Sequence, residues 1–422
     1  MSDRRVVITG VGVVAPGDSG REAFWSMISQ GRTATRRITL FDPARFRSQI
    51  GAECNFDPQR CGLSYQEIRR MDRAGQFAVA AAREAVADSG IDIPNGDPSR
   101  IGVSVGNAVG NSILMEQEYR VISDNGRRWL VDAGYMVPHL YTVVVSSSIG
   151  AEVAYATDAE GPNAVITTGC CSGIDSVGHA FDLIREGCAD VVVAGATDAP
   201  IYPISVACFD TLRASSTTND DPEHACKPFD RNRNGLVLGE GSAMFVIEDA
   251  EHAARRGARV YCEILGFCAR SNAYHMTGLR PDGREMADAI TVALDQARVD
   301  PSDIDYVNAH GSGTKQNDRH ETAAYRSSLG EHAYRVPVSS IKSMVGHSLG
   351  AIGSIEIAAC ALAIERDVVP PTANYETRDP ECDLDYVPKT AREQKVDTVL
   401  SVGSGFGGFQ SAIVLAAPGR AA

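Results

Sequence analysis

The sequence predicts an α/β protein in which buried strands alternate with helices, in two similar halves. Residues 165–168 are apolar and mostly β-branched, as in a buried strand. From Ile174 the apolar residues follow the period of a helix, and residues 190–195 (DVVVAG) form a second buried strand. Strand, crossover helix and strand therefore follow one another, and the second half repeats this alternation, which favours a layered α/β architecture.

Length and composition exclude several classes of protein. The chain has 422 residues, more than one simple core accommodates. Its net charge of −14, with no basic run, excludes nucleic acid as a partner. No apolar run reaches the ~18 residues of a membrane span, and the charged N-terminus does not resemble a secretory signal. The 11 cysteines lack zinc-type spacing, so we expect free thiols in a reducing cytoplasm and no metal.

The first half is expected to begin with a strand at residues 6–8. The segment 10–15 (GVGVVA) matches a dinucleotide-binding fingerprint, but Pro16 and Gly17 follow at once and no helix can open there. We interpret it as a turn. Further elements are predicted as a helical region at 64–89 that stops at Gly90, a strand at 101–105, and a loop, GNAVGN, at 106–111.

A long polar loop is predicted at 214–234, and a basic, polar stretch at 252–257 suggests a boundary. We divide the chain there into halves of residues 1–257 and 258–422. The second half is expected to contain strands at 260–265, 306–309, 399–402 and 412–416, a helix at 286–297, and a further helix after His347.

Cys170 and Cys171 lie where the strand at 165–168 gives way to a helix. The first N–H groups of a helix lack intrahelical partners and carry partial positive charge. They are expected to lower the pKa of a thiol there and to hold an oxyanion after attack on a carbonyl. Position alone does not decide which of the two thiols reacts.

Three further segments carry chemistry. His310 follows a strand in a loop of small residues, Lys342 and His347 precede a helix of small residues, and residues 403–409 (GSGFGGF) form a glycine loop around Phe406. A thiol, two imidazoles, an ammonium group and a flexible amide loop are the groups that acyl transfer needs.

These segments resemble the β-ketoacyl synthases. The resemblance rests on VITTGCCSG, VNAHGSGTKQND, SSIKSMVGHSLGAIGS and GSGFGGFQ, and extends to ITGVGVVAP and KPFDRNRNGLVLGEG, so it covers nearly the whole chain. The chain is most similar to the catalytic (alpha) ketosynthase subunit of type II aromatic polyketide synthases. The resemblance implies a thiolase-like, five-layered αβαβα fold with an active site between the halves.

Matched residue by residue, the resemblance implies that Cys170 is the nucleophile and that His310 and His347 are catalytic, with Lys342 nearby. Phe406 is implied as a gating aromatic residue whose backbone N–H joins that of Cys170 in the oxyanion hole. Cys171 is interpreted as a packing change. The implied substrate-binding residues are Ser312, Thr314, Met136, Val137 and Phe409, and the implied carrier-docking residues are Arg69, Arg70, Arg73, Arg127, Arg128 and Arg213.

The implied reaction is a decarboxylative condensation. An acyl chain passes from the phosphopantetheine arm of an acyl carrier protein to Cys170, and malonyl-carrier protein then supplies the two-carbon nucleophile. No bound cofactor is expected. The implied partners are the carrier protein and a cysteine-less paralogue, the chain-length factor (ketosynthase beta subunit), in a heterodimer.

Several alternatives remain. A homodimeric fatty-acid synthase would share the catalytic residues, whereas a non-catalytic chain-length subunit would lack Cys170. A thiolase is disfavoured because its chemistry needs no decarboxylating histidine pair. Residues 346–350 match G-x-S-x-G, but no histidine follows His347 to complete a Ser348 triad. The HETAA segment at His320 lacks the second histidine of a zinc protease.

Overall fold

The computed structural model describes residues 4–128 and 132–419. Its main sheet has ten strands in the order β11-β10-β14-β15-β9-β1-β8-β6-β4-β5. The first half supplies β1 (Val6–Val14), β4 (Ile101–Gly106), β5 (Asn163–Ile166), β6 (Val191–Asp198) and β8 (Gly241–Asp249). The second half supplies β9 (Cys262–Ser271), β10 (Tyr306–Asn308), β11 (Val338–Ser339), β14 (Thr398–Gly405) and β15 (Phe409–Ala416).

The two halves of this sheet have the same topology. In the first, β1–β8 and β8–β6 are antiparallel, whereas β6–β4 and β4–β5 are parallel. In the second, β9–β15 and β15–β14 are antiparallel, whereas β14–β10 and β10–β11 are parallel. Only three residue pairs between β1 and β9 join them, from Val6↔Ile264 to Ile8↔Cys262. The predicted repetition of the halves is therefore present in strand order and direction.

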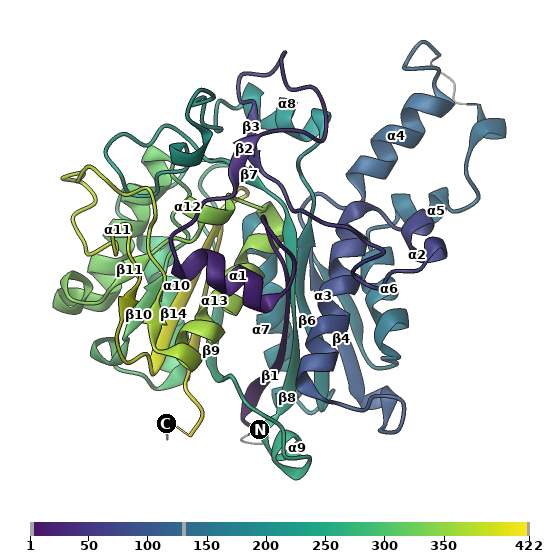
Figure 1. Cartoon of the computed structure of the whole chain (residues 1–422). Coiled ribbons are helices and arrows are strands. Elements are labelled where there is room, and N and C mark those ends of the chain that lie inside the picture. Colours follow the sequence, from purple (N-terminus) through teal and green to yellow (C-terminus); the bar gives the residue numbers. More distant parts are fainter. Residues whose placement is uncertain (1–3, 129–131, 420–422) are drawn as a thin grey trace.

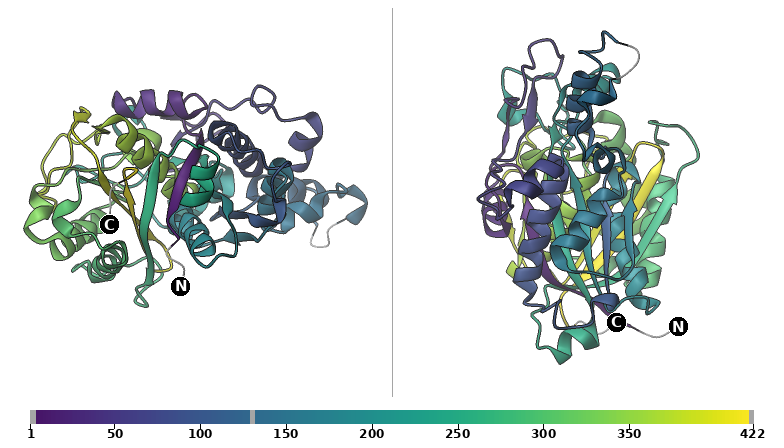
Figure 2. Two further views of the ribbon diagram at one scale, coloured as in Figure 1. Left: turned by 90° about the horizontal axis from the view of Figure 1, so that it is seen from below. Right: turned by 90° about the vertical axis from the view of Figure 1, so that its right-hand side faces the viewer.

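Helices form three layers around the two half-sheets (Figure 1). α3 (Arg73–Ser89) and α6 (Ser148–Thr157) cover the first, and α10 (Arg284–Ala297) and α11 (Lys315–Leu329) cover the second. α7 (Ser172–Arg185) and α13 (Ile352–Arg366) lie between them and contact strands of both halves. Figure 2 shows the first half, purple to teal, beside the second, green to yellow. This arrangement is the predicted five-layered αβαβα fold.

Smaller elements surround this body. β2 (Thr35–Arg37), β3 (Ile50–Ala52) and β7 (Leu238–Gly239) form a three-stranded sheet near α8 (Pro203–Thr211). The others are α1 (Arg21–Ser29), α2 (Tyr65–Arg70), α4 (Ser112–Ile122), α5 (Leu140–Val144), α9 (Ala250–Arg255), α12 (Lys342–Val345), β12 (Val368–Val369) and β13 (Arg392–Glu393). In the described ranges, every helix is too short or too polar to span a membrane.

Two local predictions were wrong, at 10–15 and at the strand before Cys170. The segment 10–15 is not a turn, because β1 continues through Gly10 and Gly12. A Cβ atom at either position would collide with the backbone of α3, at Ala85 or Ala81, so these glycines let the helix approach the strand. The helical region predicted at 64–89 is present as two helices, α2 and α3, and ends at Gly90 as expected. The strand before Cys170 is not buried: β5 is a half-buried edge strand that ends at Ile166.

The two central helices touch through their backbones. A Cβ atom added to Gly353 of α13 would lie 2.8 Å from the backbone nitrogen of Ile174 in α7. One added to Gly173 of α7 would lie 3.0 Å from the Cα atom of Gly353, and closer still to the nitrogen of Ser354. Only glycine fits on either side of this crossing, which brings the N-terminal ends of both helices together.

We expect Gly353→Ala to destabilise the fold by about 1–3 kcal/mol, because the added methyl group overpacks a backbone contact that cannot yield. Gly96→Ala is the matched control, since the nearest atom to its Cβ would lie 3.4 Å away, in ordinary contact. Denaturant unfolding of both variants measures the difference. Equal stability of the two variants would show that the helices separate without cost.

Candidate active site

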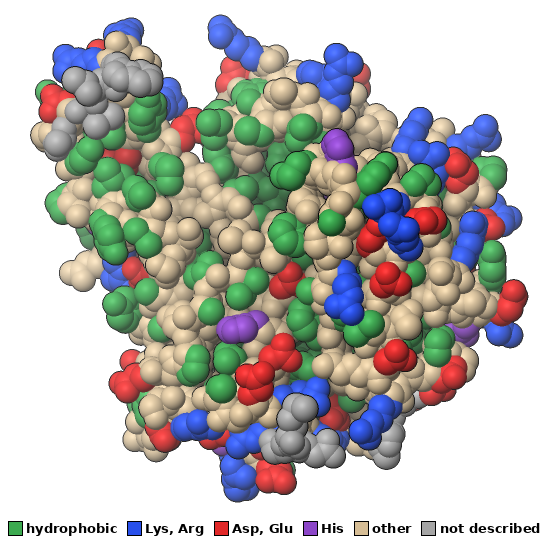
Figure 3. Space-filling view, turned by 180° about the vertical axis from the view of Figure 1, so that it is seen from behind, with side chains coloured by type: hydrophobic (Ala, Val, Ile, Leu, Met, Phe, Trp, Pro, Cys, Tyr) green, Lys and Arg blue, Asp and Glu red, His purple; other side chains and the backbone are tan. Residues whose placement is uncertain are grey.

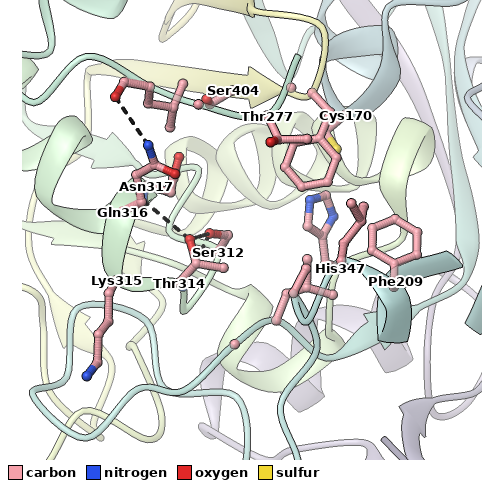
Figure 4. Close-up of a pocket in the computed structure, with 18 of the residues that line it drawn as sticks. Cys170, Phe209, Thr277, Ser312, Thr314, Lys315, Gln316, Asn317, His347 and Ser404 are labelled. Atoms are coloured by element: carbon pink, nitrogen blue, oxygen red, sulfur yellow. Dashed lines mark hydrogen bonds between the residues drawn. The ribbon is translucent and has the colours of Figure 1, made fainter. Parts of the chain in front are cut away.

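Cys170 lies in the single 3-10 turn, Gly169–Cys171, that joins β5 to α7. The hydroxyl of Ser172 holds this turn: it accepts a hydrogen bond from the backbone N–H of Thr168 at 2.9 Å and donates one to the Gly169 carbonyl at 2.7 Å. Ala108 and Val109, from the predicted GNAVGN loop, and Phe209 of α8 belong to the same apolar cluster as Cys170. The thiol is half-buried and faces a pocket (Figure 4).

The backbone N–H groups of Phe406 and of Cys170 itself favour the thiolate form and lower the pKa of the Cys170 thiol. The resemblance implies that the same two groups are the oxyanion donors. The expected lowering of the Cys170 pKa is nevertheless wrong for the resting chain. Burial raises the pKa of the Cys170 thiol to about 11, and Lys342 and the two N–H groups offset only part of that effect. The resting site therefore holds Cys170 mainly as a protonated thiol at pH 7.

Cys171 points into the core and is fully buried. Its pKa is raised well above that of an ordinary thiol, first by burial and then by the neighbouring Asp175 carboxyl. Since nucleophilic attack needs a thiolate and access, this geometry supports the interpretation of Cys171 as a packing residue.

His310 and His347 lie edge to face, with ring centroids 5.3 Å apart, and only 3% and 2% of their surfaces are exposed. Burial and the charge of Lys342 hold the pKa of both imidazoles well below the usual value, so both are neutral at pH 7. The Nδ1 atom of His347 accepts the N–H of Leu349 at 3.2 Å, which assigns its proton to Nε2. A left-handed backbone at Leu349, φ 49°, turns that N–H toward the ring.

Lys342 is fully buried and sets the tautomer of His310. Its ammonium group lies 3.5 Å from Nδ1 of His310 and can only donate, so the proton of His310 is also on Nε2. The ammonium group donates in addition to the His310 carbonyl and, at 2.5 Å, to Glu356 of α13. Burial raises the pKa of Glu356 to about 7, against the opposing effect of Lys342.

Two further buried carboxyl groups support the loops that carry the histidines. Glu321 of α11 accepts the backbone N–H groups of His310 and Gly311 at 2.6 and 2.8 Å. Asp198, at the end of β6, accepts the N–H of Gly350 at 2.7 Å, just after His347. Burial raises the pKa of each of these two groups to about 7.

These supporting acids were missed from the sequence. For Glu356 a signal existed, because it interrupts the long uncharged stretch 352–364 of α13, and a buried charge there needs a partner. Glu321 lies in the HETAA segment, where the sequence pattern bears only on metal binding and does not indicate a contact with the His310 loop.

The pocket has a volume of about 490 Å³ and extends from Cys170, His310 and His347 to the surface. Ser312 and Thr314 line it, as predicted for substrate binding, and their hydroxyl groups lie 3.0 Å apart. Phe406 also lines the pocket and stacks on Phe209 with ring centroids 6.4 Å apart.

The other predicted substrate-binding residues lie elsewhere. Phe409 begins β15 behind the Phe406 loop, and Met136 and Val137 lie between α4 and α5. None of the three is among the described residues that line the pocket. For Met136 and Val137, the reason is that the pocket of one chain does not reach this outer segment.

The predicted docking arginines divide into two groups. Arg70 forms a bidentate ion pair with Glu152, and Arg73 pairs with the fully buried Glu240 at 2.6 Å. The other four are exposed on the surface: Arg69, Arg127, Arg128 and Arg213.

A thiol beside two neutral imidazoles, in one pocket of a thiolase fold, is the arrangement expected of a condensing enzyme. Matches to models of known protein families identify the family of this chain. Residues 3–253 match the beta-ketoacyl synthase N-terminal domain and residues 261–376 match the beta-ketoacyl synthase C-terminal domain. The chain belongs to the β-ketoacyl synthase family, an acyltransferase class.

Curated relatives and solved structures show which members of the family the chain is similar to. The chain is 64% identical, over 99% of its length and 98% of the relative's, to the tetracenomycin polyketide synthase ketoacyl synthase alpha subunit of Streptomyces glaucescens. It is 63% identical, over 98% of its length and 88% of the relative's, to the actinorhodin polyketide putative beta-ketoacyl synthase 1 of Streptomyces coelicolor.

Among solved structures, the chain superposes on a type II polyketide synthase ketosynthase in complex with its acyl-carrier protein, AntDE:AntF. The TM-score is 0.91 and the identity 37%, over 98% of this chain and 99% of that one. It also superposes on the ishigamide ketosynthase/chain length factor, with a TM-score of 0.90 and 34% identity, over 99% of this chain and 100% of that one.

The raised pKa of Cys170 makes a prediction for alkylation. The rate of reaction with iodoacetamide should rise about tenfold per pH unit between pH 7 and pH 10, because the thiolate fraction grows throughout that range. Peptide mapping should find Cys170 labelled and Cys171 unmodified, with the exposed Cys188 and Cys208 as internal references. A plateau below pH 8, or labelling of Cys171, would contradict this account.

Proposed function

We propose that this chain is the catalytic ketosynthase of a type II polyketide synthase and carries out decarboxylative condensation of malonyl-acyl carrier protein with an acyl group on Cys170. The observation that carries the proposal is the pairing of two buried imidazoles, each with its proton on Nε2, with the Cys170 thiol in one pocket. The identity with polyketide alpha subunits supports the polyketide type over the fatty-acid alternative. The presence of Cys170 opposes the non-catalytic alternative.

The first step is acyl transfer. The sulfur of Cys170 attacks the thioester carbonyl of the acyl-carrier protein, and the N–H groups of Cys170 and Phe406 hold the oxyanion. Collapse breaks the bond to the pantetheine sulfur, which leaves with the proton of the Cys170 thiol. Because the thiol is protonated at rest, proton transfer to the leaving sulfur has to accompany the attack.

The second step makes the carbon nucleophile. Malonyl-carrier protein loses CO₂, and the electron pair of the broken bond forms an enolate. The enolate oxygen accepts hydrogen bonds from the Nε2–H groups of His310 and His347. Its carbon attacks the acyl-Cys170 carbonyl, the same two N–H groups hold the oxyanion, and Cys170 leaves as a thiolate that takes a proton from water. Lys342, which holds His310 in the right tautomer, is a positioning residue.

His310→Ala and His347→Ala should separate the two steps. Each removes an enolate donor, which costs on the order of 10²–10³ in the rate of condensation, whereas Cys170 acylation should change by less than about tenfold. Intact mass measures acylation, and CO₂ release from malonyl-carrier protein measures decarboxylation. His347→Asn keeps an N–H donor and should retain more condensation than His347→Ala. Equal losses in acylation and decarboxylation would refute this role for the histidines.

We propose a chain-length factor as the second subunit, against an open surface around α4 to α6. The side chains of Tyr135, Tyr141, Val144 and Tyr155 are more than half exposed there, Tyr141 by 74%, and β5 offers an unpaired sheet edge beside them. Figure 3 shows hydrophobic side chains gathered along this side of the molecule. The ketosynthase/chain length factor similarity supports a paralogue as the occupant. Met136 and Val137 would then complete the acyl tunnel at the interface.

Co-expression with a cysteine-less paralogue should yield a stable 1:1 complex, because a surface of this kind is covered in obligate assemblies. Native mass spectrometry measures the stoichiometry, and an elongation assay shows whether product length follows the partner. Tyr141→Asp should weaken the complex without changing acylation of Cys170. A stable homodimer that makes full-length product alone would favour the fatty-acid type.

The carrier protein is the other proposed partner. Acidic carriers require local positive charge on a chain of net charge −14, and the exposed Arg69, Arg127, Arg128 and Arg213 supply it. We assign Arg70 and Arg73 a supporting role, since each pairs at 2.6 Å with a carboxylate that is itself largely buried. Arg127 and Arg128 also lie near carboxylates, of Asp124 at 3.9 Å and Asp132 at 3.8 Å, but these pairs are exposed and weak. The substrate arrives on the carrier's arm, so the reaction needs no bound cofactor, and we place it in the cytoplasm.

A further inference from the structure

The pocket changes character from its inner to its outer end. His310 and His347 are buried beside Cys170, Ser312 is buried, Thr314 is half-buried, and Lys315 is exposed. Figure 4 shows the Lys315 ammonium group at the opposite end of the drawn residues from the Cys170 thiol. A substrate arm that reaches Cys170 therefore enters past Lys315.

Two cationic side chains line the outer part of the pocket. Arg213 follows the C-terminal end of α8, and Lys315 is the first residue of α11. Each is exposed, and they belong to different halves of the chain. Together they place two positive charges at the rim of a cavity whose inner residues are neutral at pH 7 or paired.

Neither Arg213 nor Lys315 forms an ion pair with another residue in the part of the chain that the structure describes. The chain has five lysines, and four of them pair with carboxylates: Lys227, Lys342, Lys389 and Lys395. Lys315 is the exception, since within residues 4–128 and 132–419 no carboxylate lies within ion-pair distance of it or of Arg213. Two exposed cations that line one pocket and form no ion pair within the described residues are free to bind an anionic group that enters it.

The backbone at Arg213 adds a second observation. Its φ of 53° is left-handed, which costs a non-glycine residue of order 1 kcal/mol or more. The N–H of Arg213 donates to the Asp210 carbonyl at 3.0 Å, and the N–H of Ala214 donates to that of Phe209 at 3.2 Å. These bonds hold Arg213 at the rim directly after the helix that supplies Phe209.

We propose that Arg213 and Lys315 form a clamp for the phosphodiester of the phosphopantetheine arm. This proposal rests on the proposed function. The clamp holds the outer end of the arm, Ser312 and Thr314 line its path, and Cys170 receives the acyl group. Charge-assisted hydrogen bonds from a guanidinium and an ammonium group suit a phosphate oxygen at this place. The clamp positions the thioester and takes no part in the bond changes.

The test uses two carrier-free donors that differ in one group. They are octanoyl-pantetheine and the methyl phosphodiester of octanoyl-phosphopantetheine, and the rate constant of Cys170 acylation by each is measured by intact mass on the full chain. The wild type should react about tenfold faster with the phosphodiester. That ratio should fall to about threefold in Arg213→Ala and in Lys315→Ala and to about one in the double variant, and it should shrink with added salt.

Matched variants separate charge from structure. Lys315→Arg keeps a cation and should keep the ratio. Arg298→Ala removes an exposed arginine with the same backbone conformation, φ 54°, outside the pocket, and should also leave it unchanged. The rate with octanoyl-pantetheine should be the same in every variant.

Three results would overturn the clamp. A ratio near one in the wild type, or a tenfold ratio in the double variant, would show that the phosphate is not held by these residues. A higher KM for intact carrier protein with an unchanged ratio would assign both cations to carboxylates of the carrier. Failure of both donors to acylate Cys170 would instead contradict the proposed function.

Discussion

The active site depends on a contact that contains no catalytic group, the crossing of α7 and α13 at Gly173 and Gly353. Cys170 precedes the first helix by one turn and His347 precedes the second. If the helix axes were separated by the width of one side chain, the sulfur and the imidazole would no longer face one pocket. The close approach of α7 and α13, which brings Cys170 and His347 to one pocket, therefore depends on two glycines.

A single buried cation organises the electrostatics. Lys342 lowers the pKa of both histidines, assigns the proton of His310 to Nε2, and lies against Glu356 in a region without solvent. A buried ammonium group without a carboxylate would be too costly to retain. Glu356 thus stabilises the buried Lys342, and burial together with the charge of Lys342 keeps both imidazoles neutral.

Much of the fold could be predicted from the sequence because strand and helix periods differ and because the repeated β/α alternation leaves few architectures. The nucleophile turn and the two histidine loops could also be located, since small residues surround each of them. The errors share a physical cause. Gly10 and Gly12 have the local appearance of a turn, and only the approach of α3 from residues 81–85 explains them as strand.

Contacts between residues far apart in the sequence also determine the properties of the site. The pKa of Cys170 is governed by burial, which is a property of the assembled halves, and not by the helix start alone. The roles of Glu321 and Asp198 arise from backbone N–H groups that lie 10 or more residues away along the chain. Pairings at such separations leave no periodic signal in one sequence.

The matching topology of the two half-sheets gives α7 and α13 equivalent places, since α7 lies between β5 and β6 in the chain and α13 between β11 and β14. The contact of Gly173 with Gly353 therefore brings two equivalent helix beginnings together. The groups before these helices differ, a thiol at Cys170 and an imidazole at His347. A repeated architecture thus produces an asymmetric site, to which each half contributes a different chemical group.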